Sequence, residues 1–261
     1  MNNLQKIGVG ITTYNRPKYL QQTIVGVANH ILPYVDRVVV YNDGSDKSYD
    51  KTYRWMKRET PQIEVIDAQT NHGVAYAKNQ LFANLMDDCD FIFLLEDDVV
   101  PTHKNAIVGY LAAAKMTGLD HFCFAHHGPA NTKAVGINGP IVFWPNCVGA
   151  YCFYTKQLLE EVGLMDENFK NAWEHVEHSW RIMKKRGLDY GYWPDVLGSE
   201  EWLGEIPGSI DNSAIGGQES RERIEVILKG LEYWQSKDKD FPAEHTLDIY
   251  RKALHDFNST T

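Results

Sequence analysis

Three consecutive carboxylates, Glu96, Asp97 and Asp98, follow a short apolar run, and Pro101 closes the segment. The apolar run at 91–95 has the length of a buried strand, so the carboxylates fall on the turn after it. Side chains alternate across an extended backbone, which places Glu96 and Asp98 on one side and Asp97 on the other. Two carboxylates on one side can share a hard cation such as Mg2+ or Mn2+ that bridges a diphosphate. The alternative is an acidic turn that is only solvated.

Strands and helices alternate through the first hundred residues. Apolar and β-branched runs predict strands at 7–13, 37–41, 63–66 and 91–95. Apolar residues spaced by three or four predict a helix at 18–30, the segment 50–59 is helix-like, and the turn at 71–73 opens a helix at 74–86. This order predicts right-handed crossovers and a single Rossmann-like, mostly parallel sheet flanked by helices, with ligands bound beyond the carboxyl ends of its strands. The residues at those ends are Tyr14, Asp43, Asn71 and Glu96.

Composition narrows the class of protein. The 261 residues include 26 basic and 35 acidic ones, a formal net charge of −9, which disfavours stable binding to nucleic acid or to an anionic membrane. No apolar run approaches the ~20 residues that span a bilayer, and no secretory leader precedes the first strand. Four cysteines without a Cys-x-x-Cys pair indicate free thiols in a reducing compartment. We therefore expect a cytoplasmic protein without a transmembrane segment.

Several motifs occur in a fixed order along the chain. They lie at 12–17, 42–45, 71–73 with 77–79, the acidic turn, and 162–169 followed by 173–181. In this order they resemble the family 2 glycosyltransferases with the GT-A fold, which transfer a sugar from a nucleotide diphosphate. The resemblance covers roughly residues 6–200. We expect a GT-A domain at 1–206, and a closing loop and C-terminal helical extension at 207–261.

The turn after the first strand can hold a nucleobase. Tyr14 offers a face for stacking, while Thr12 and Thr13 offer hydrogen bonds. Asp43 can accept the imide proton of uracil or thymine, and by resemblance the donor is then a UDP-sugar. Gly73 lets the backbone approach the ligand. A tyrosine at the edge of the core and an ordinary tight turn are the structural alternatives. The resemblance adds further donor residues, namely Asn15, Arg16, Asn71 and Lys78.

The resemblance also assigns roles within the acidic turn. Asp98 is the first choice as metal ligand and Glu96 the second, with Asp97 touching ribose or sugar hydroxyls. The family pattern usually has Asp where this chain has Glu96, so we expect divalent-cation dependence but not a particular metal. Lys78 would contact the diphosphate, unless it is an exposed helical lysine. The pair His126 and His127 could contact acceptor or metal, although a pair that simply flanks a turn is favoured.

A helix at 173–181 offers the candidate base. Helical spacing puts an aromatic face inward and turns another face toward a cleft, made of Glu174, Glu177, His178 and Arg181. In inverting members of the family a Glu-Asp pair stands here, and its Asp deprotonates the acceptor hydroxyl. This chain has Glu174 and His175, and either could be the base, since histidine has an ordinary pKa of about 6.5. A structural role for His175 in holding a neighbouring loop is the alternative. Inversion is preferred, but this departure leaves the stereochemistry open.

The sequence thus predicts a metal-dependent hexosyl- or N-acetylhexosaminyl-transferase acting on a glycan or glycoconjugate acceptor. The alternatives are a nucleotidyltransferase, a binding protein that has lost catalysis, and glycosylation of a modified base in DNA, which the acidity disfavours. Beyond Pro207, residues 210–217 resemble a loop that can close over the donor. Helical spacing at 219–234 and 243–257 predicts two helices that pack on the domain or form a homodimer.

Overall fold

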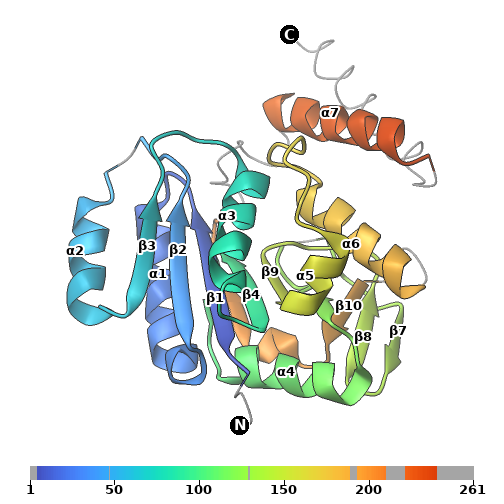
Figure 1. Cartoon of the computed structure of the whole chain (residues 1–261), viewed down its shortest axis with the longest axis horizontal. Coiled ribbons are helices and arrows are strands. Elements are labelled where there is room, and N and C mark those ends of the chain that lie inside the picture. Colours follow the sequence, from blue (N-terminus) through green and yellow to red (C-terminus); the bar gives the residue numbers. More distant parts are fainter. Residues whose placement is uncertain (1–4, 47, 129, 189–192, 210–220, 240–261) are drawn as a thin grey trace.

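The computed structural model describes residues 5–46, 48–128, 130–188, 193–209 and 221–239. Within these residues six strands form the main sheet, in the order β3-β2-β1-β4-β9-β6 (Figure 1). Its parallel strands are β3 (Ile63–Asp67), β2 (Arg37–Asn42), β1 (Ile7–Thr13) and β4 (Phe91–Glu96). β9 (Tyr151–Thr155) runs antiparallel to β4, and β6 (His121–Cys123) antiparallel to β9. The predicted mostly parallel α/β sheet is confirmed.

Helices cover both faces of this sheet. On one face the core includes α1 (Pro17–Gly26), α2 (Asp50–Glu59) and α4 (Asn105–Thr117). A π-helical turn at Val27–Ile31 and a 3-10 turn at Leu32–Tyr34 extend α1, which accounts for the longer helix predicted there. On the other face the core includes α3 (Val74–Met86), α5 (Lys156–Val162) and α6 (Glu174–Arg186). The strands are apolar throughout because alternate residues face two buried layers.

The α3 helix lies unusually close to β1. A Cβ atom on Gly8 would stand 2.9 Å from Cys89 Sγ, and one on Gly10 would stand 3.0 Å from Leu81 Cβ. Real Cβ atoms rarely approach so closely, so the two glycines let α3 settle onto the centre of the sheet. This contact brings the first turns of α3, including Lys78, to the carboxyl end of β4.

Two small antiparallel sheets accompany the main one, although the sequence predicted a single sheet. One has the order β10-β8-β7 and the other pairs β11 with β5 in the described residues. Their strands are β5 (Val99–Pro101), β7 (Gly136–Asn138), β8 (Ile141–Trp144), β10 (Trp193–Val196) and β11 (Leu203–Glu205). A 3-10 turn at Ser199–Glu201 precedes β11. The pairing of β11 with β5 carries residues 203–209 to the acidic turn, where Ile206 N donates to Asp98 O at 3.0 Å.

The predicted helix at 219–234 is present as α7 (Arg221–Lys237), which lies beside the N-terminal end of α6 (Figure 1). Its apolar stripe is buried within the chain, since Leu231 is 0% and Trp234 1% exposed. Asp166 Oδ2 fixes the helix by accepting from Tyr233 Oη at 2.8 Å and Lys237 Nζ at 2.7 Å. The predicted loop at 210–217 and helix at 243–257 lie outside the described residues. The domain boundary after residue 206 and the homodimer remain predictions.

Candidate active site

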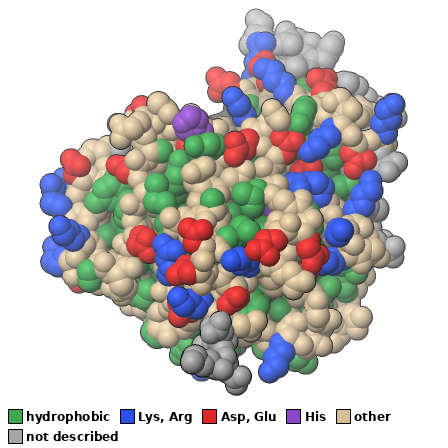
Figure 2. Space-filling model, viewed as in Figure 1, with side chains coloured by type: hydrophobic (Ala, Val, Ile, Leu, Met, Phe, Trp, Pro, Cys, Tyr) green, Lys and Arg blue, Asp and Glu red, His purple; other side chains and the backbone are tan. Residues whose placement is uncertain are grey.

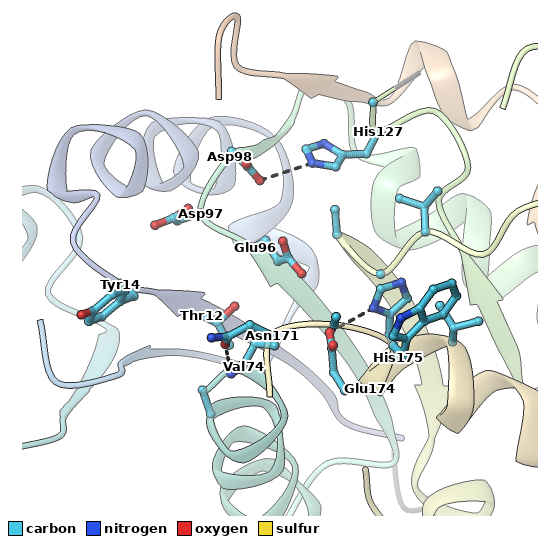
Figure 3. Close-up of a pocket in the computed structure, with 18 of the residues that line it drawn as sticks. Thr12, Tyr14, Val74, Glu96, Asp97, Asp98, His127, Asn171, Glu174 and His175 are labelled. Carbon is cyan, nitrogen blue, oxygen red and sulfur yellow. Dashed lines mark hydrogen bonds and ion pairs between the residues drawn. The ribbon is translucent and has the colours of Figure 1, made fainter. Parts of the chain in front are cut away.

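A cavity of about 620 Å3 opens at the carboxyl ends of β1, β2 and β4 (Figure 3). Cavities of this size are typical of small-molecule and cofactor sites. The predicted site residues that line it are Thr12, Thr13, Tyr14, Arg16, Asp43, Asn71, Glu96, Asp97, Asp98, Glu174 and His175. Asn15, Gly73 and Lys78 do not line it. Figure 3 places Tyr14 on one side and His175 on the other, with the acidic turn between them.

The acidic turn is arranged differently from the alternation predicted for it. Asp97 and Asp98 both reach one guanidinium, since Arg16 Nη1 lies 3.1 Å from Asp97 Oδ1 and Arg16 Nη2 2.9 Å from Asp98 Oδ2. Glu96 turns instead toward Lys78, 2.9 Å away. The reason is that β4 ends at Glu96 and the next two residues form a turn, where strand alternation no longer applies. Glu96 and Asp98 are therefore not presented as a preformed ligand pair.

Asp97 has a distinct environment within this turn. Its carboxylate accepts from Thr13 Oγ1 at 2.6 Å and its side chain is almost fully buried. Burial raises the pKa of Asp97 to about 7, against the opposing effect of Arg16. Arg16 is thus the cation that compensates two buried carboxylates, and its Nε has no hydrogen-bond partner among the described residues.

Asp98 and His127 fit a divalent cation. Asp98 Oδ1 is buried and accepts no hydrogen bond in the described part of the chain, and His127 Nε2 lies 3.8 Å from it. Glu205 Oε2 fixes the histidine loop by accepting from Gly128 N at 2.7 Å. No group of three or more His, Cys, Asp or Glu side chains able to hold a metal occurs in the described residues. Mg2+ and Mn2+ commonly complete a small protein ligand set with phosphate oxygens and water, so the chemistry of one Asp and one His side chain is compatible with either ion.

Lys78 is an internal cation rather than a lining residue. Its side chain is 1% exposed, and its Nζ lies 2.9 Å from Glu96 Oε1 and 3.5 Å from Glu174 Oε1. It also donates to Gly149 O at 3.2 Å. The predicted contact with a diphosphate is not open to an ammonium enclosed in this way. Lys78 instead joins the strand end that carries the acidic turn to the helix that carries the candidate base.

Glu174 and His175 form a carboxylate–imidazole dyad, drawn with a dashed line in Figure 3. Glu174 Oε1 lies 3.0 Å from His175 Nδ1. Burial opposes the ionisation of Glu174, but His175 and Lys78 outweigh it and lower the pKa of Glu174 to about 2. Burial likewise opposes the charged imidazole, and Glu174 outweighs it, so the pKa of His175 is raised. Because the carboxylate takes Nδ1, Nε2 is the ring nitrogen left for a substrate.

The backbone around the dyad is close-fitting. A Cβ atom on Gly149 would stand 2.2 Å from His175 Cγ, so the imidazole packs directly on the main chain of Gly149. Trp173, the residue before α6, has a φ of 71°, and Asn171 has a φ of 62°. Both values lie in the left-handed region that non-glycine residues rarely adopt, and such residues concentrate at functional sites. Asn171 Oδ1 anchors this segment by accepting from Val74 N at 3.2 Å.

Only part of the acidic face predicted for α6 reaches the cavity. Glu174 faces the cavity as expected, but Glu177 is buried and pairs with Arg181 Nε at 2.8 Å. His178 is also buried, and its Nε2 lies 2.8 Å from Gly163 O. The acidic face is therefore satisfied internally beyond its first residue.

On the donor side, Asp43 organises the loop that was expected to touch the ligand. Its two carboxylate oxygens accept from His72 N at 3.0 Å and Gly73 N at 2.9 Å. Gly73 has a φ of 96°, which only glycine adopts readily, and this allows the loop to turn into α3. Asn15 N donates to Ser45 Oγ at 2.8 Å, which joins the turns after β1 and β2. The imide contact of Asp43 remains a prediction.

Several lining residues were not selected from the sequence. His127 was weighed but a turn role was preferred, whereas His126 packs edge-on against Trp144 with ring centroids 4.7 Å apart. Arg223 and Ile227 reach the cavity from α7. Only the His-His-Gly-Pro run could have indicated His127. No local pattern marks the α7 residues, because their place depends on a contact between distant segments.

Comparisons with known proteins concern the family and the fold. The family model described as Glycosyl transferase family 2 matches residues 8–129. A search of curated protein sequences gives no match. Solved structures that resemble the chain include S. aureus TarS 1-349, with 13% identity over 96% of this chain and 69% of that one, at a TM-score of 0.57.

Two further structures contain ligands. The mannosyltransferase PcManGT from Pyrobaculum calidifontis, in complex with GDP-Man and Mn2+, has 12% identity over 97% of this chain and 71% of its own, with a TM-score of 0.60. GalNAc-T7 with UDP, GalNAc and Mn2+ has 14% identity and a TM-score of 0.65, and covers 97% of this chain. This chain spans 55% of the GalNAc-T7 chain. At these identities the likeness establishes the fold.

Proposed function

Because residues 8–129 match the model of glycosyltransferase family 2 and the chain has the GT-A glycosyltransferase fold, we propose that it transfers a sugar from a nucleotide diphosphate to a hydroxyl group in a metal-dependent reaction. One observation carries the proposal: Asp98 and the Glu174–His175 dyad line the same cavity from different elements. In this proposal the acidic turn serves the diphosphate and the dyad serves the acceptor hydroxyl.

The donor is a UDP-sugar in this proposal. Tyr14 supplies a stacking surface, and Asp43 lies at the same end of the cavity as an acceptor for an imide proton. Structural neighbours crystallised with UDP, UDP-GlcNAc or GDP-Man support a nucleotide-sugar donor in general. The transferred group is a hexosyl or N-acetylhexosaminyl unit.

His175 acts as the general base. In its neutral form Nε2 takes the proton of the acceptor hydroxyl as the oxygen attacks the anomeric carbon, and the bond to the nucleoside diphosphate breaks. Glu174 orients the ring through Nδ1 and stabilises the imidazolium that forms. A single displacement of this kind inverts the anomeric configuration.

In this proposal three residues help to offset the charge on the leaving diphosphate, namely Arg16, Asp98 and His127. Asp98 and His127 would hold a divalent cation, which when bound offsets the charge that develops on the departing diphosphate. Arg16 already lies against the acidic turn and can give its guanidinium to phosphate oxygens once the carboxylates have another cation. Glu96 is the weaker candidate ligand because Lys78 holds it.

The acceptor in this proposal is a glycan or glycoconjugate. Charged side chains of both signs are interspersed over the face seen in Figure 2, without a single basic patch that would suit a nucleic acid. No described helix has the length and apolarity to cross a bilayer. Four free cysteines are consistent with the proposed cytoplasmic location.

A ligand-dependent thermal-shift experiment tests the donor site. UDP, GDP, CMP and their sugar conjugates are each added with Mn2+, with Mg2+ or with a chelator. We expect stabilisation by UDP conjugates that needs the cation and disappears in Asp98→Asn, whereas the exposed Asp87→Asn behaves as wild type. Stabilisation by no nucleotide under any condition would refute the proposed donor site. Pyrophosphate release from a nucleoside triphosphate would point to a nucleotidyltransferase instead.

A further inference from the structure

Three thiols lie close together beside the cavity. Cys123 Sγ lies 3.7 Å from Cys147 Sγ and 3.6 Å from Cys152 Sγ. The remaining cysteine, Cys89, is buried at the other end of α3 and takes no part. Sulfur atoms this close need to move by less than 2 Å to reach the disulfide bond length of about 2.05 Å.

The three thiols differ in access. Cys147 is partly exposed and lines the cavity, whereas Cys123 and Cys152 are 2% and 1% exposed. Cys147 lies in a stretch without helix or strand that joins β8 to β9, so its backbone is free of ladder hydrogen bonds. Cys123 and Cys152 sit opposite each other in the β6–β9 ladder and are held by it. An oxidant entering the cavity therefore meets Cys147 first, with Cys123 next to it.

We propose that Cys147 is an oxidation-sensitive modification site of this cavity, with Cys123 as the thiol that captures its oxidised form in a disulfide. A peroxide supplies the oxidant. The Cys147 sulfur attacks one peroxide oxygen, the O–O bond breaks, and a sulfenic acid and water form. The Cys123 sulfur then attacks the sulfenic sulfur, the S–O bond breaks, and a second water leaves as the disulfide forms. One peroxide is reduced and two thiols are oxidised.

The disulfide would reach the dyad through Gly149. Two residues beyond Cys147, Gly149 supports the His175 ring and accepts from Lys78 Nζ. Drawing Cys147 toward β6 displaces this stretch, so the imidazole loses its support and Lys78 loses a carbonyl partner. Transfer should fall while the donor end of the cavity, built on β1, β2 and β4, is left in place.

The test treats the full chain with hydrogen peroxide and maps its disulfides by mass spectrometry. We expect a Cys123–Cys147 link in wild type that dithiothreitol removes. Cys147→Ser should prevent it, Cys123→Ser should leave a sulfenic acid at Cys147, and Cys89→Ser should behave as wild type. With nucleotide-sugar turnover as a second measurement, oxidation should lower the rate about 100-fold, the scale of loss from a 1 Å displacement. Donor-induced thermal stabilisation should persist.

Disulfide mapping does not depend on the proposed transferase function, so the two can fail separately. No Cys123–Cys147 link in wild type, or equal oxidation of Cys89, would overturn the proposed site. A link that forms but leaves turnover unchanged would overturn its action on His175. If Cys147→Ser does not fold, Cys147→Ala and the wild-type disulfide map still decide the matter.

Discussion

The charge of one histidine controls the proposed chemistry. His175 must be neutral to accept a proton, yet Glu174 raises its pKa above the ordinary value of about 6.5. The rate should therefore rise with pH as the imidazole loses its proton. Glu174, with a pKa lowered to about 2, is ionised throughout the usual range but pairs with Lys78 and holds the His175 ring, which makes it a weak base.

Replacing Glu174 with glutamine should shift the acidic limb of the pH–rate profile. Without the carboxylate, burial and Lys78 favour the neutral imidazole, so the midpoint of the limb in kcat/KM moves to lower pH. The maximal rate should fall about 100-fold, because the imidazolium formed in the reaction loses its counter-charge. A wild-type profile with no limb between pH 5 and 9 would contradict this and favour Glu174 as the base.

The packing of the His175 ring on Gly149 gives a second prediction about a single residue. Gly149→Ala places a methyl group in the space of the His175 ring, so turnover should fall by about 100-fold while donor binding persists. Gly136→Ala is the matched control, because a Cβ there meets no atom within 4 Å. Steady-state kinetics with donor-binding measurements separate the effects. Equal behaviour of the two variants would show that the ring does not need this support.

At the scale of elements, the N-terminal end of α6 depends on α7. Trp173 Nε1 donates to Ile227 O at 3.1 Å, which joins the residue before α6 to the middle of α7. The two segments also approach closely at Gly230, where an added Cβ would stand 2.8 Å from Trp173 Cδ1. The C-terminal helix is thus a wall of the cavity as well as a cover for the core.

The variant Gly230→Ala tests this contact, because the contact and helix propensity predict opposite changes in stability. Alanine in an exposed helix interior stabilises by about 1 kcal/mol relative to glycine. Here the added methyl group pushes against Trp173, so we expect a lower Tm and weaker substrate binding. A rise in Tm measured by calorimetry would mean that α7 is not packed on Trp173.

The elements that the sequence predicted well are those that local pattern determines. The strands at 7–13 and 91–95 are short apolar runs between polar breaks, and they alternate with helical segments such as 74–86, so their type follows from the local sequence. The pairing of β11 with β5 escaped prediction because each strand has three residues and gains its partner only in the fold. Arg223 and Ile227 escaped prediction for the same reason, because they reach the cavity only when α7 packs on the domain.

At the scale of the whole molecule, Lys78 links the two halves of the site. Replacing it with methionine leaves Glu96 and Glu174 close together without their shared cation, at a cost of about 3–5 kcal/mol in unfolding free energy. Both carboxylates should then have raised pKa values in the folded state, so protonation favours folding as the pH falls. Wild-type Glu174 behaves oppositely, since its lowered pKa gives stability that is lost as pH falls from about 4.3 toward 2.

Urea unfolding from pH 8 to pH 4 checks this expectation. The difference in unfolding free energy between wild type and Lys78→Met should be largest at pH 8 and shrink as the pH falls. The exposed Lys57→Met should differ little from wild type at any pH. A difference for Lys78→Met that stays constant with pH would mean that the ammonium does not hold these two carboxylates.

The most direct test of the account is UDP release from UDP-sugars in the presence of Mn2+, with water or a candidate glycan as acceptor. Wild type should release UDP from at least one UDP-sugar, and Asp98→Ala should abolish release. His175→Ala should lower release at least ~100-fold while keeping donor-induced stabilisation. Release from no nucleotide sugar, or full activity in both variants, would contradict a glycosyltransferase built on Asp98 and His175.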